Sequence, residues 1–294
     1  MLKIARILLP AALLLAWAVP LKLQAEQKIR VLLADGPQKA HNFKETTPVL
    51  QEVLEQSPLF EVTLSRSSKK KIKSGSYQPD FASYDVVVMN EGFGAAPWPE
   101  ATQKAFEEYM AKGGGLVSVH AANNCWPEWE EYNKMTGIGG WGGRDEKSGP
   151  YLYLDDAGQV IRDPSPGKGG AHGPQHEFEI VVREPTHPIM EGLPATFLHG
   201  PDELYDRLRG PAENLTILAS AFSSPEYAGT GRHEPVLMTI QYGEGRVFHT
   251  ILGHHVEHLR EGSFVTTFQR GTEWAATGKV TIPVPEDFPN QPLR

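Results

Sequence analysis

The sequence contains a single cysteine, Cys125, among its 294 residues. An intramolecular disulfide is therefore excluded, and so are structural zinc sites that need several thiolates. The sequence also lacks an excess of basic residues, because 28 Lys and Arg stand against 36 Asp and Glu, for a net charge of -8. Nucleic-acid-binding domains are usually basic, so we expect no nucleic-acid partner.

Several nucleophile and phosphate-binding motifs are also missing. The G-x-S-x-G elbow of α/β-hydrolases does not occur. Three consecutive glycines at 113–115 precede an apolar, strand-like run instead of opening a helix, which excludes a dinucleotide fingerprint and a phosphate loop. His172 and His176 are four residues apart, but the Gly173-Pro174 pair between them excludes the helix on which zincins present two histidines.

The first 25 residues have the pattern of a secretory signal peptide. Lys3 and Arg6 form a short positive region, residues 7–21 are all apolar, and Ala25 is a small residue at the expected cleavage point. The apolar run is short for a membrane span. We therefore expect cleavage after residue 25, a periplasmic or secreted mature protein, and no stable membrane insertion after cleavage.

The first half of the mature chain alternates buried strands with helices. Short apolar runs at 29–34, 86–89 and 116–119 are typical of strands that are buried on both faces. Apolar residues at helical spacing over 46–56, and a helix pattern over 99–111, lie between them. This alternation predicts a parallel α/β sheet.

The second half of the chain has a different composition. Residues 137–211 are rich in Gly, Pro and His, which predicts a large loop and hairpin insertion covering the sheet. Further strand patterns and a closing helix at 264–277 follow. We expect a signal peptide over 1–25, one compact domain over 26–282, and a Pro-rich C-terminal tail over 283–294.

Polar side chains follow the predicted strands at the points where they end. In parallel sheets, ligands bind beyond the carboxyl ends of the strands. Imidazole is both the usual general base near neutral pH and a common metal ligand. The candidate catalytic residues are His41, Glu91, His120 and His254.

The same reasoning gives candidate ligands for a metal and for a substrate. His120, His176 and His254 are the candidate ligands of a divalent ion such as Zn, Mn or Fe. Tryptophan rings provide apolar platforms for sugar rings, although core packing explains them equally well. The candidate substrate contacts are Asn90, Trp126, Trp141, His176, Asp202 and Glu203.

Several separated motifs, in this order, resemble those of ThuA-like (trehalose utilisation) proteins. They are GGGLVSVH at 113–120, HGPQHEF at 172–178, DELY at 202–205 and GRVFHTILGH at 245–254. The resemblance covers roughly residues 28–277. It implies a flavodoxin-like, three-layer parallel sheet akin to that of class I glutamine amidotransferases.

The resemblance also has implications for function, and one of them comes from a difference between this sequence and the class I amidotransferases. His120 stands at the place of the nucleophilic cysteine of class I amidotransferases, so thioester chemistry has no nucleophile and glutaminase activity is not expected. The family is linked to disaccharide utilisation through 3-keto sugar derivatives, in which the keto group acidifies the neighbouring C–H bond. A base and a cation can exploit that acidity.

Two functional hypotheses follow from these observations. The first is an exported carbohydrate-active enzyme that acts on disaccharides, glycosides or their 3-keto derivatives, with a functional link to a separate sugar oxidoreductase. The second is a non-catalytic sugar-binding or accessory protein that works beside such an oxidoreductase. In both, the partner is a small-molecule carbohydrate, and the oligomeric state, a homo-oligomer included, stays open.

Overall fold

The computed structural model describes residues 28–289, so the predicted signal peptide lies outside the described part of the chain. Its centre is one mixed sheet of eleven strands, and nine of them follow the order β2-β1-β3-β4-β13-β12-β11-β8-β9. The parallel half consists of β2 (Phe60–Arg66), β1 (Ile29–Asp35), β3 (Val86–Asn90), β4 (Gly115–Val119) and β13 (Gly245–Thr250).

The other half of the sheet is antiparallel. It consists of β12 (His233–Tyr242), β11 (Leu215–Phe222), β8 (His176–Val182) and β9 (Thr196–Asp202). A side branch is formed by β5 (Tyr151–Leu154), which pairs with β12 and with β6 (Val160–Asp163). A separate two-stranded ladder joins β7 (Ala171–His172) to β10 (Tyr205–Asp206).

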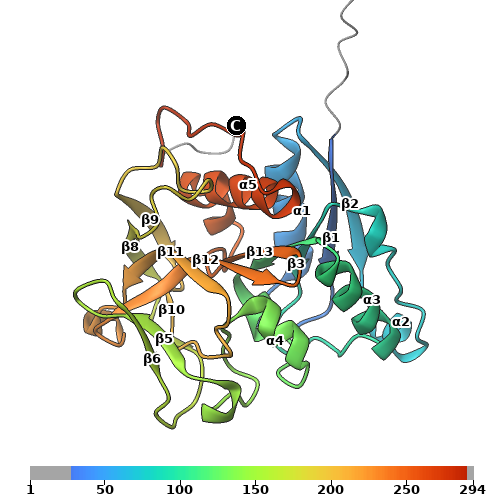
Figure 1. Cartoon of the computed structure of the whole chain (residues 1–294), viewed down its shortest axis with the longest axis horizontal. Helices are drawn as coiled ribbons and strands as arrows, with labels where there is room; N and C mark the ends of the chain where they lie inside the picture. Colours follow the sequence, from blue (N-terminus) through green and yellow to red (C-terminus); the bar gives the residue numbers. More distant parts are fainter. Residues whose placement is uncertain (1–27, 290–294) are drawn as a thin grey trace, which may run out of the picture.

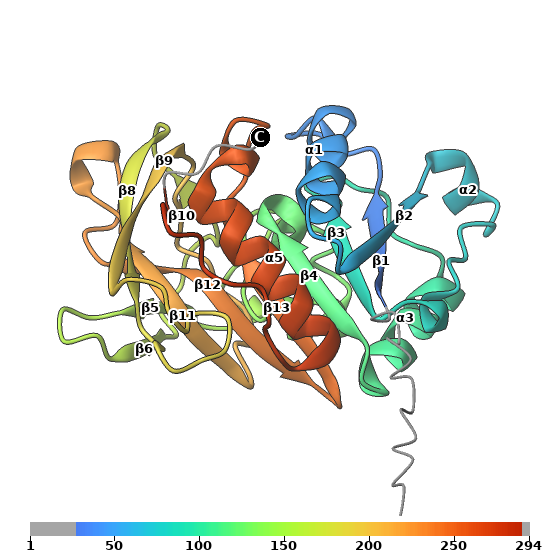
Figure 2. The ribbon, with the colours of Figure 1, turned by 90° about the horizontal axis from the view of Figure 1, so that it is seen from above.

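Helices cover both faces of the parallel half (Figures 1 and 2). One face carries α1 (Phe43–Glu55) and α5 (Gly262–Thr277), and the other carries α3 (Glu100–Ala111) and α4 (Glu130–Thr136). A short helix, α2 (Lys69–Lys73), follows β2. No helix within residues 28–289 has the length and apolar character that crossing a membrane requires.

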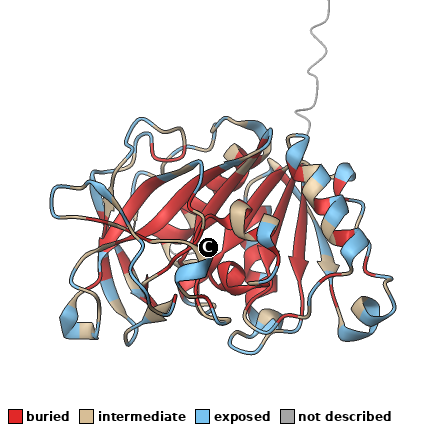
Figure 3. Cartoon of the chain, turned by 60° about the horizontal axis from the view of Figure 1, so that its bottom comes forward, coloured by how far each residue is buried: buried red, intermediate tan, exposed pale blue. Residues whose placement is uncertain are grey.

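The core lies between the sheet and these helices, where the strands are buried (Figure 3). All five residues of β3 and all five of β4 are buried, as expected for strands with helices on both faces. Helix α1 begins after Asn42, whose side chain accepts a hydrogen bond from the backbone N–H of Lys44. Its buried face includes Val49, Leu50 and Val53.

The predicted α/β fold and its parallel strands are confirmed. Residues 137–211 contain the expected loops and hairpins, but the β8–β9 hairpin extends the sheet itself instead of covering it. In β8, buried Phe178 and Ile180 alternate with exposed Glu177 and Glu179, which is the pattern of a strand with one solvated face. Within the predicted tail, Phe288 packs against Phe197.

Candidate functional site

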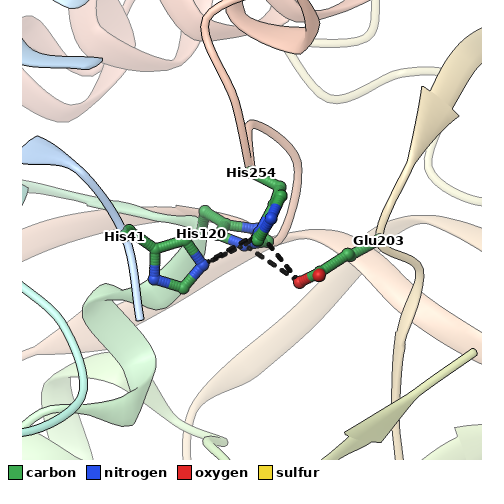
Figure 4. A group of neighbouring side chains, drawn as sticks. All are labelled: His41, His120, Glu203 and His254. Atoms are coloured by element: carbon green, nitrogen blue, oxygen red, sulfur yellow. Dashed lines mark hydrogen bonds and ion pairs between the residues drawn. The ribbon is translucent and has the colours of Figure 1, made fainter. Parts of the chain in front are cut away.

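Three histidines meet at the carboxyl edge of the parallel strands (Figure 4). His41 lies in the loop after β1, His120 directly follows β4, and His254 lies four residues beyond the end of β13. Their side chains, together with that of Glu203 after β9, offer ligand atoms that all lie within 4.8 Å of one another. The parallel strand order therefore brings together residues that are up to 213 positions apart.

The ring nitrogens form a small triangle. His41 Nε2 lies 2.9 Å from His254 Nδ1 and 3.2 Å from His120 Nε2, and the last two atoms are 3.3 Å apart. The carboxylate of Glu203 places Oε2 2.9 Å from His254 Nδ1 and 3.7 Å from His120 Nε2. Three nitrogens and one oxygen thus face a common centre.

The backbone at His120 directs its ring to this centre. Its φ of 44° lies in the left-handed region, which is uncommon for a residue other than glycine. Its Nδ1 lies 2.6 Å from the carbonyl oxygen of Ile251, and a carbonyl can only accept, so Nδ1 carries the proton. In the neutral ring, Nε2 then presents a lone pair to the other two histidines.

The loop that carries His254 depends on a glycine. Gly253 has a φ of +106°, and a Cβ at this position would lie 2.6 Å from Leu259 Cδ2. The Gly253 N–H donates to Asp202 Oδ2 at 2.8 Å, which ties the loop to the residue before Glu203. A glycine here therefore permits both the turn and the close approach of His254 to Glu203.

Burial keeps the imidazoles of His41 and His120 uncharged at neutral pH. Burial and then the neighbouring His254 lower the pKa of His41 to about 4. Burial and then His41 lower the pKa of His120 well below its usual value. Imidazoles this close repel each other once protonated, so the neutral forms of His41 and His120 are favoured.

Asp202 holds the residues of the cluster in place through hydrogen bonds. Its carboxylate is fully buried and accepts hydrogen bonds from His199 Nε2 at 3.0 Å and from the Glu203 N–H at 2.8 Å, and it pairs with His258 Nδ1 at 2.8 Å. Burial alone would raise the pKa of Asp202, but the bonds from His199 and His258 hold it well below its usual value. Asp202 is therefore a buried anion that positions Glu203 and the loop after β13.

A cavity of about 220 Å³ opens onto the histidines. Besides three members of the cluster, its wall includes Trp141, His172 and Tyr205. Trp141 packs edge-on against Tyr205, with ring centroids 4.7 Å apart. His172 Nε2 lies 3.6 Å from Glu203 Oε1. The remaining lining residues are Ala40, Phe93 and Asn124.

The structure does not bring every predicted residue to this site. His176, predicted as a metal ligand and substrate contact, begins β8 and stacks on Tyr227 with centroids 4.0 Å apart. It is not among the converging ligand atoms of the described chain, and Glu203 takes that place instead. Asp202, predicted as a substrate contact, is fully buried behind Glu203 and does not line the cavity at the histidines.

Asn90 and Glu91 are also placed away from the histidines. Asn90 Nδ2 donates to the hydroxyls of Thr46 and Thr47, which fastens the end of β3 to α1. Glu91 is buried and accepts from Trp98 Nε1 at 3.0 Å. Burial raises the pKa of Glu91 to about 7. Neither residue lines the cavity at the histidines within the described part of the chain, so their predicted catalytic and binding roles have no geometric support.

Of the two tryptophans predicted to contact substrate, one lies at the site cavity and the other is mainly packed in the core. Trp141 lines the site cavity, as a substrate platform would. Trp126 is buried in a cluster with Trp98, Trp129 and Tyr132, which is core packing, but its remaining surface lines a neighbouring cavity.

Tyr205 and His172 are site residues that were not among the predicted ones. Both lie in motifs that were visible in the sequence, DELY and HGPQHEF. The signal that separates them from their neighbours is the β7–β10 ladder, which pairs Tyr205 with His172. That ladder joins two-residue strands, which are too short for a periodicity argument to find.

Comparisons with known proteins agree on one family. Residues 30–275 match the family model ThuA, described as trehalose utilisation. The crystal structure of a ThuA-like protein from Parabacteroides merdae is 42% identical, with a TM-score of 0.85 over 90% of this chain and 95% of that chain. A ThuA-like protein from Bacteroides uniformis is 19% identical, with a TM-score of 0.60 over 90% and 97%, and shows the same fold. No curated protein matches the chain.

Proposed function

Because the chain belongs to the ThuA family of trehalose-utilisation proteins, we propose that it acts on glycosides or their 3-keto derivatives at the cluster of His41, His120, Glu203 and His254, and that this cluster binds a divalent metal ion. The observation that carries the proposal is the convergence of three imidazole nitrogens and one carboxylate at the wall of a cavity.

The donor set fits a small divalent cation. Nitrogens bound at about 2.0–2.1 Å to a tetrahedral ion lie about 3.3–3.4 Å apart, and the separations here are 2.9, 3.2 and 3.3 Å. Histidines that bind metals usually donate their second N–H to a carbonyl or carboxylate. His120 does so through Nδ1 to Ile251. Zinc, manganese and iron all accept such imidazole and carboxylate ligands.

The chemistry follows from this placement. A divalent ion would polarise a bound keto oxygen and so acidify the adjacent C–H bond. His172 lies at the cavity wall, where it can hold or move a proton beside a sugar carbon. Trp141 offers an apolar ring for the C–H face of the sugar, and Tyr205 offers a hydroxyl.

The experiment is a measurement of bound metal in the purified protein by elemental mass spectrometry, beside the variant His120→Ala. We expect about one equivalent of divalent metal in the parent protein, lost in the variant. The variant should also lose turnover of 3-keto glucosides, followed by chromatography of the products, while its far-UV circular dichroism is unchanged. Turnover that survives in His120→Ala would contradict the proposal.

The second hypothesis, a sugar-binding accessory protein, gives a different result in the same assay. Such a protein would bind the glycoside saturably and release no product, with or without added metal. Activity that appears only when a sugar oxidoreductase is added would place the chain downstream of that oxidation.

We also propose that the protein is exported and loses residues 1–25. The support is the charge and apolar pattern of those residues together with the small Ala25. Mass spectrometry of the protein from its native host tests this. A mature chain that begins at Glu26 is expected, and an intact N-terminus on a cytoplasmic protein would contradict it.

A further inference from the structure

A second cavity adjoins the site cavity. Its volume is about 310 Å³, and it shares Phe93 and Asn124 with the cavity at the histidines. The next residue after Trp141, Gly142, lines the second cavity. The site cavity alone, about 220 Å³, falls below the roughly 300 Å³ at which ligand pockets begin. A ligand that fills the site is therefore expected to continue past Phe93 and Asn124.

The wall of the second cavity is mainly apolar. Its carbon surface comes from Phe93, Ala95, Pro97, Trp126 and Trp129. Flat aromatic groups pack well against such walls, because ring faces and edges attract one another.

Three polar side chains of that wall are already engaged in hydrogen bonds, and the exposed side chain of Glu128 is a further polar group of the wall. Trp126 Nε1 donates to the carbonyl of Ala96 at 3.1 Å, and Trp129 Nε1 donates to Glu107 at 2.6 Å. Gln103 Nε2 donates to the carbonyl of Trp98 at 2.9 Å. A second sugar ring would bring several hydroxyls into this cavity, and many would lose water without gaining a partner, which costs free energy.

Phe93 and Asn124 line both cavities, and Asn124 is the polar one of the two. Asn124 is buried, and its Oδ1 makes no hydrogen bond to any residue of the described chain, 28–289. A buried carbonyl oxygen without a donor is rare in proteins and suits a ligand hydroxyl. Since Asn124 lines both cavities, that hydroxyl would belong to the sugar beside its linkage to the next group.

We propose that the second cavity is the subsite for the aglycone of a glycoside, and that it takes a flat apolar group, such as an aromatic ring, in preference to a second sugar. This inference rests on the proposed function, since it places the reacting sugar in the site cavity. Asn124 then anchors a hydroxyl of that sugar, and Phe93 and Trp126 contact the aglycone.

The test is isothermal titration calorimetry with the 3-keto derivatives of methyl glucoside, phenyl glucoside and trehalose, using both anomers of the first two. Ala95 lines the second cavity and not the site cavity, so Ala95→Leu narrows only the former. Pro97→Ala removes apolar surface from the wall of the second cavity. Pro97 is exposed, so this change should have little effect on the stability of the fold. Ala157→Leu, in an exposed turn, is the matched control.

The 3-keto derivative of phenyl glucoside should bind about tenfold more tightly than that of methyl glucoside. The 3-keto derivative of trehalose should bind no more tightly than that of methyl glucoside. Ala95→Leu and Pro97→Ala should reduce the phenyl advantage and leave the affinity for methyl glucoside unchanged, while Ala157→Leu should bind like the parent protein.

Other results overturn the inference. If the trehalose derivative bound more tightly than the phenyl glucoside derivative, and Ala95→Leu abolished that difference in affinity, the second cavity would be a subsite for a second sugar. A phenyl advantage that survives in both cavity variants would place the ring elsewhere. Binding of methyl glucoside with no phenyl gain would refute only the aglycone subsite, whereas no binding of any glycoside would refute the proposed function as well.

Discussion

The hydroxyl oxygen of Tyr205 lies 2.7 Å from Nε2 of His120, the ring nitrogen that faces the other two histidines. Since Nδ1 of His120 carries the ring proton, the hydrogen of this contact belongs to the tyrosine. Burial raises the pKa of Tyr205 well above its usual value, so the phenol keeps that hydrogen at neutral pH. Tyr205 therefore competes with a cation for His120 and is also a proton donor at the cavity wall.

This contact gives a prediction for Tyr205→Phe. Loss of the hydroxyl removes the competitor, so metal affinity should be unchanged or higher. Loss of a proton donor should lower kcat about 10²-fold, the low end for general acid–base groups. Metal titration and steady-state kinetics measure the two effects. Tyr242→Phe, which removes a phenol bonded to Glu131 instead, should change neither. A fall in metal affinity would show that Tyr205 supports the ion instead.

The two histidines that flank the loop between β7 and β8 give a second prediction. His172 lines the cavity near Glu203, whereas His176 stacks on Tyr227. His172→Ala should lower kcat/KM at least about tenfold, because a polar group beside the reacting sugar is lost. His176→Ala is the matched control and should stay within about twofold of the parent. Equal losses in both variants would contradict the placement of the loop.

The sequence was informative about the parallel half of the fold and about the three central histidines. Strands buried on both faces have an apolar signature, and topology alone brings their carboxyl ends to one edge. His41, His120 and His254 were therefore predictable from their positions after such strands. No contact between side chains had to be known.

The same reasoning failed where side-chain direction or antiparallel pairing decides which residue reaches the site. Glu91 follows a buried strand like His120 does, but its side chain turns inward to Trp98. His176 and His172 are both near the sheet, and only the two-residue β7–β10 ladder decides which one reaches Glu203. Adjacent Asp202 and Glu203 look alike in the sequence, although one is a buried anchor and the other lines the cavity.

Asp202 gives a third prediction. In Asp202→Asn, one acceptor oxygen becomes an NH₂ group that meets donors such as His199, His258 or the Gly253 N–H. Breaking a buried charged network in this way costs about 3–5 kcal/mol. Misplacement of Glu203 and His254 should also weaken metal binding about 10–100-fold. Urea denaturation and metal titration measure these effects.

Glu273→Gln is the control that distinguishes a loss of stability from a loss of metal binding. Glu273 is buried and accepts from Thr281 and Ile282, so its loss should also destabilise the fold. It belongs to α5 and not to the cluster, so metal affinity should be retained. If Asp202→Asn unfolded at a lower urea concentration but bound metal normally, its positioning role would be refuted.

Cys125 gives a fourth prediction. The thiol is buried, and burial raises its pKa well above the usual value, so the reactive thiolate is suppressed. The native protein should react slowly with Ellman's reagent, and the urea-unfolded protein should release one equivalent of dye. Cys125→Ser should keep turnover. Loss of turnover with the fold intact would reopen an amidotransferase-like thiol mechanism.

His249 makes stability depend on pH. Its ring is fully buried, with Nδ1 2.8 Å from the Thr136 carbonyl oxygen and Nε2 3.0 Å from Asn123 Nδ2. Burial lowers the pKa of His249 to about 4, whereas an unfolded imidazole titrates near 6.5. Between these two pH values the unfolded chain binds a proton that the folded chain does not. The free energy of unfolding therefore falls as the pH is lowered through this window, by up to about 1.4 kcal/mol per pH unit from this residue.

Urea denaturation at several pH values between 7 and 4.5, with EDTA present to remove any effect of metal release, measures this slope. His249→Gln keeps a hydrogen-bonding side chain and cannot titrate. The variant should be less stable than the parent protein at pH 7. Its free energy of unfolding should fall less steeply on acidification, because up to one fewer proton is taken up on unfolding. An unchanged slope would mean that the folded protein binds a proton at His249 as readily as the unfolded chain does, and that the burial of this ring is relieved in solution.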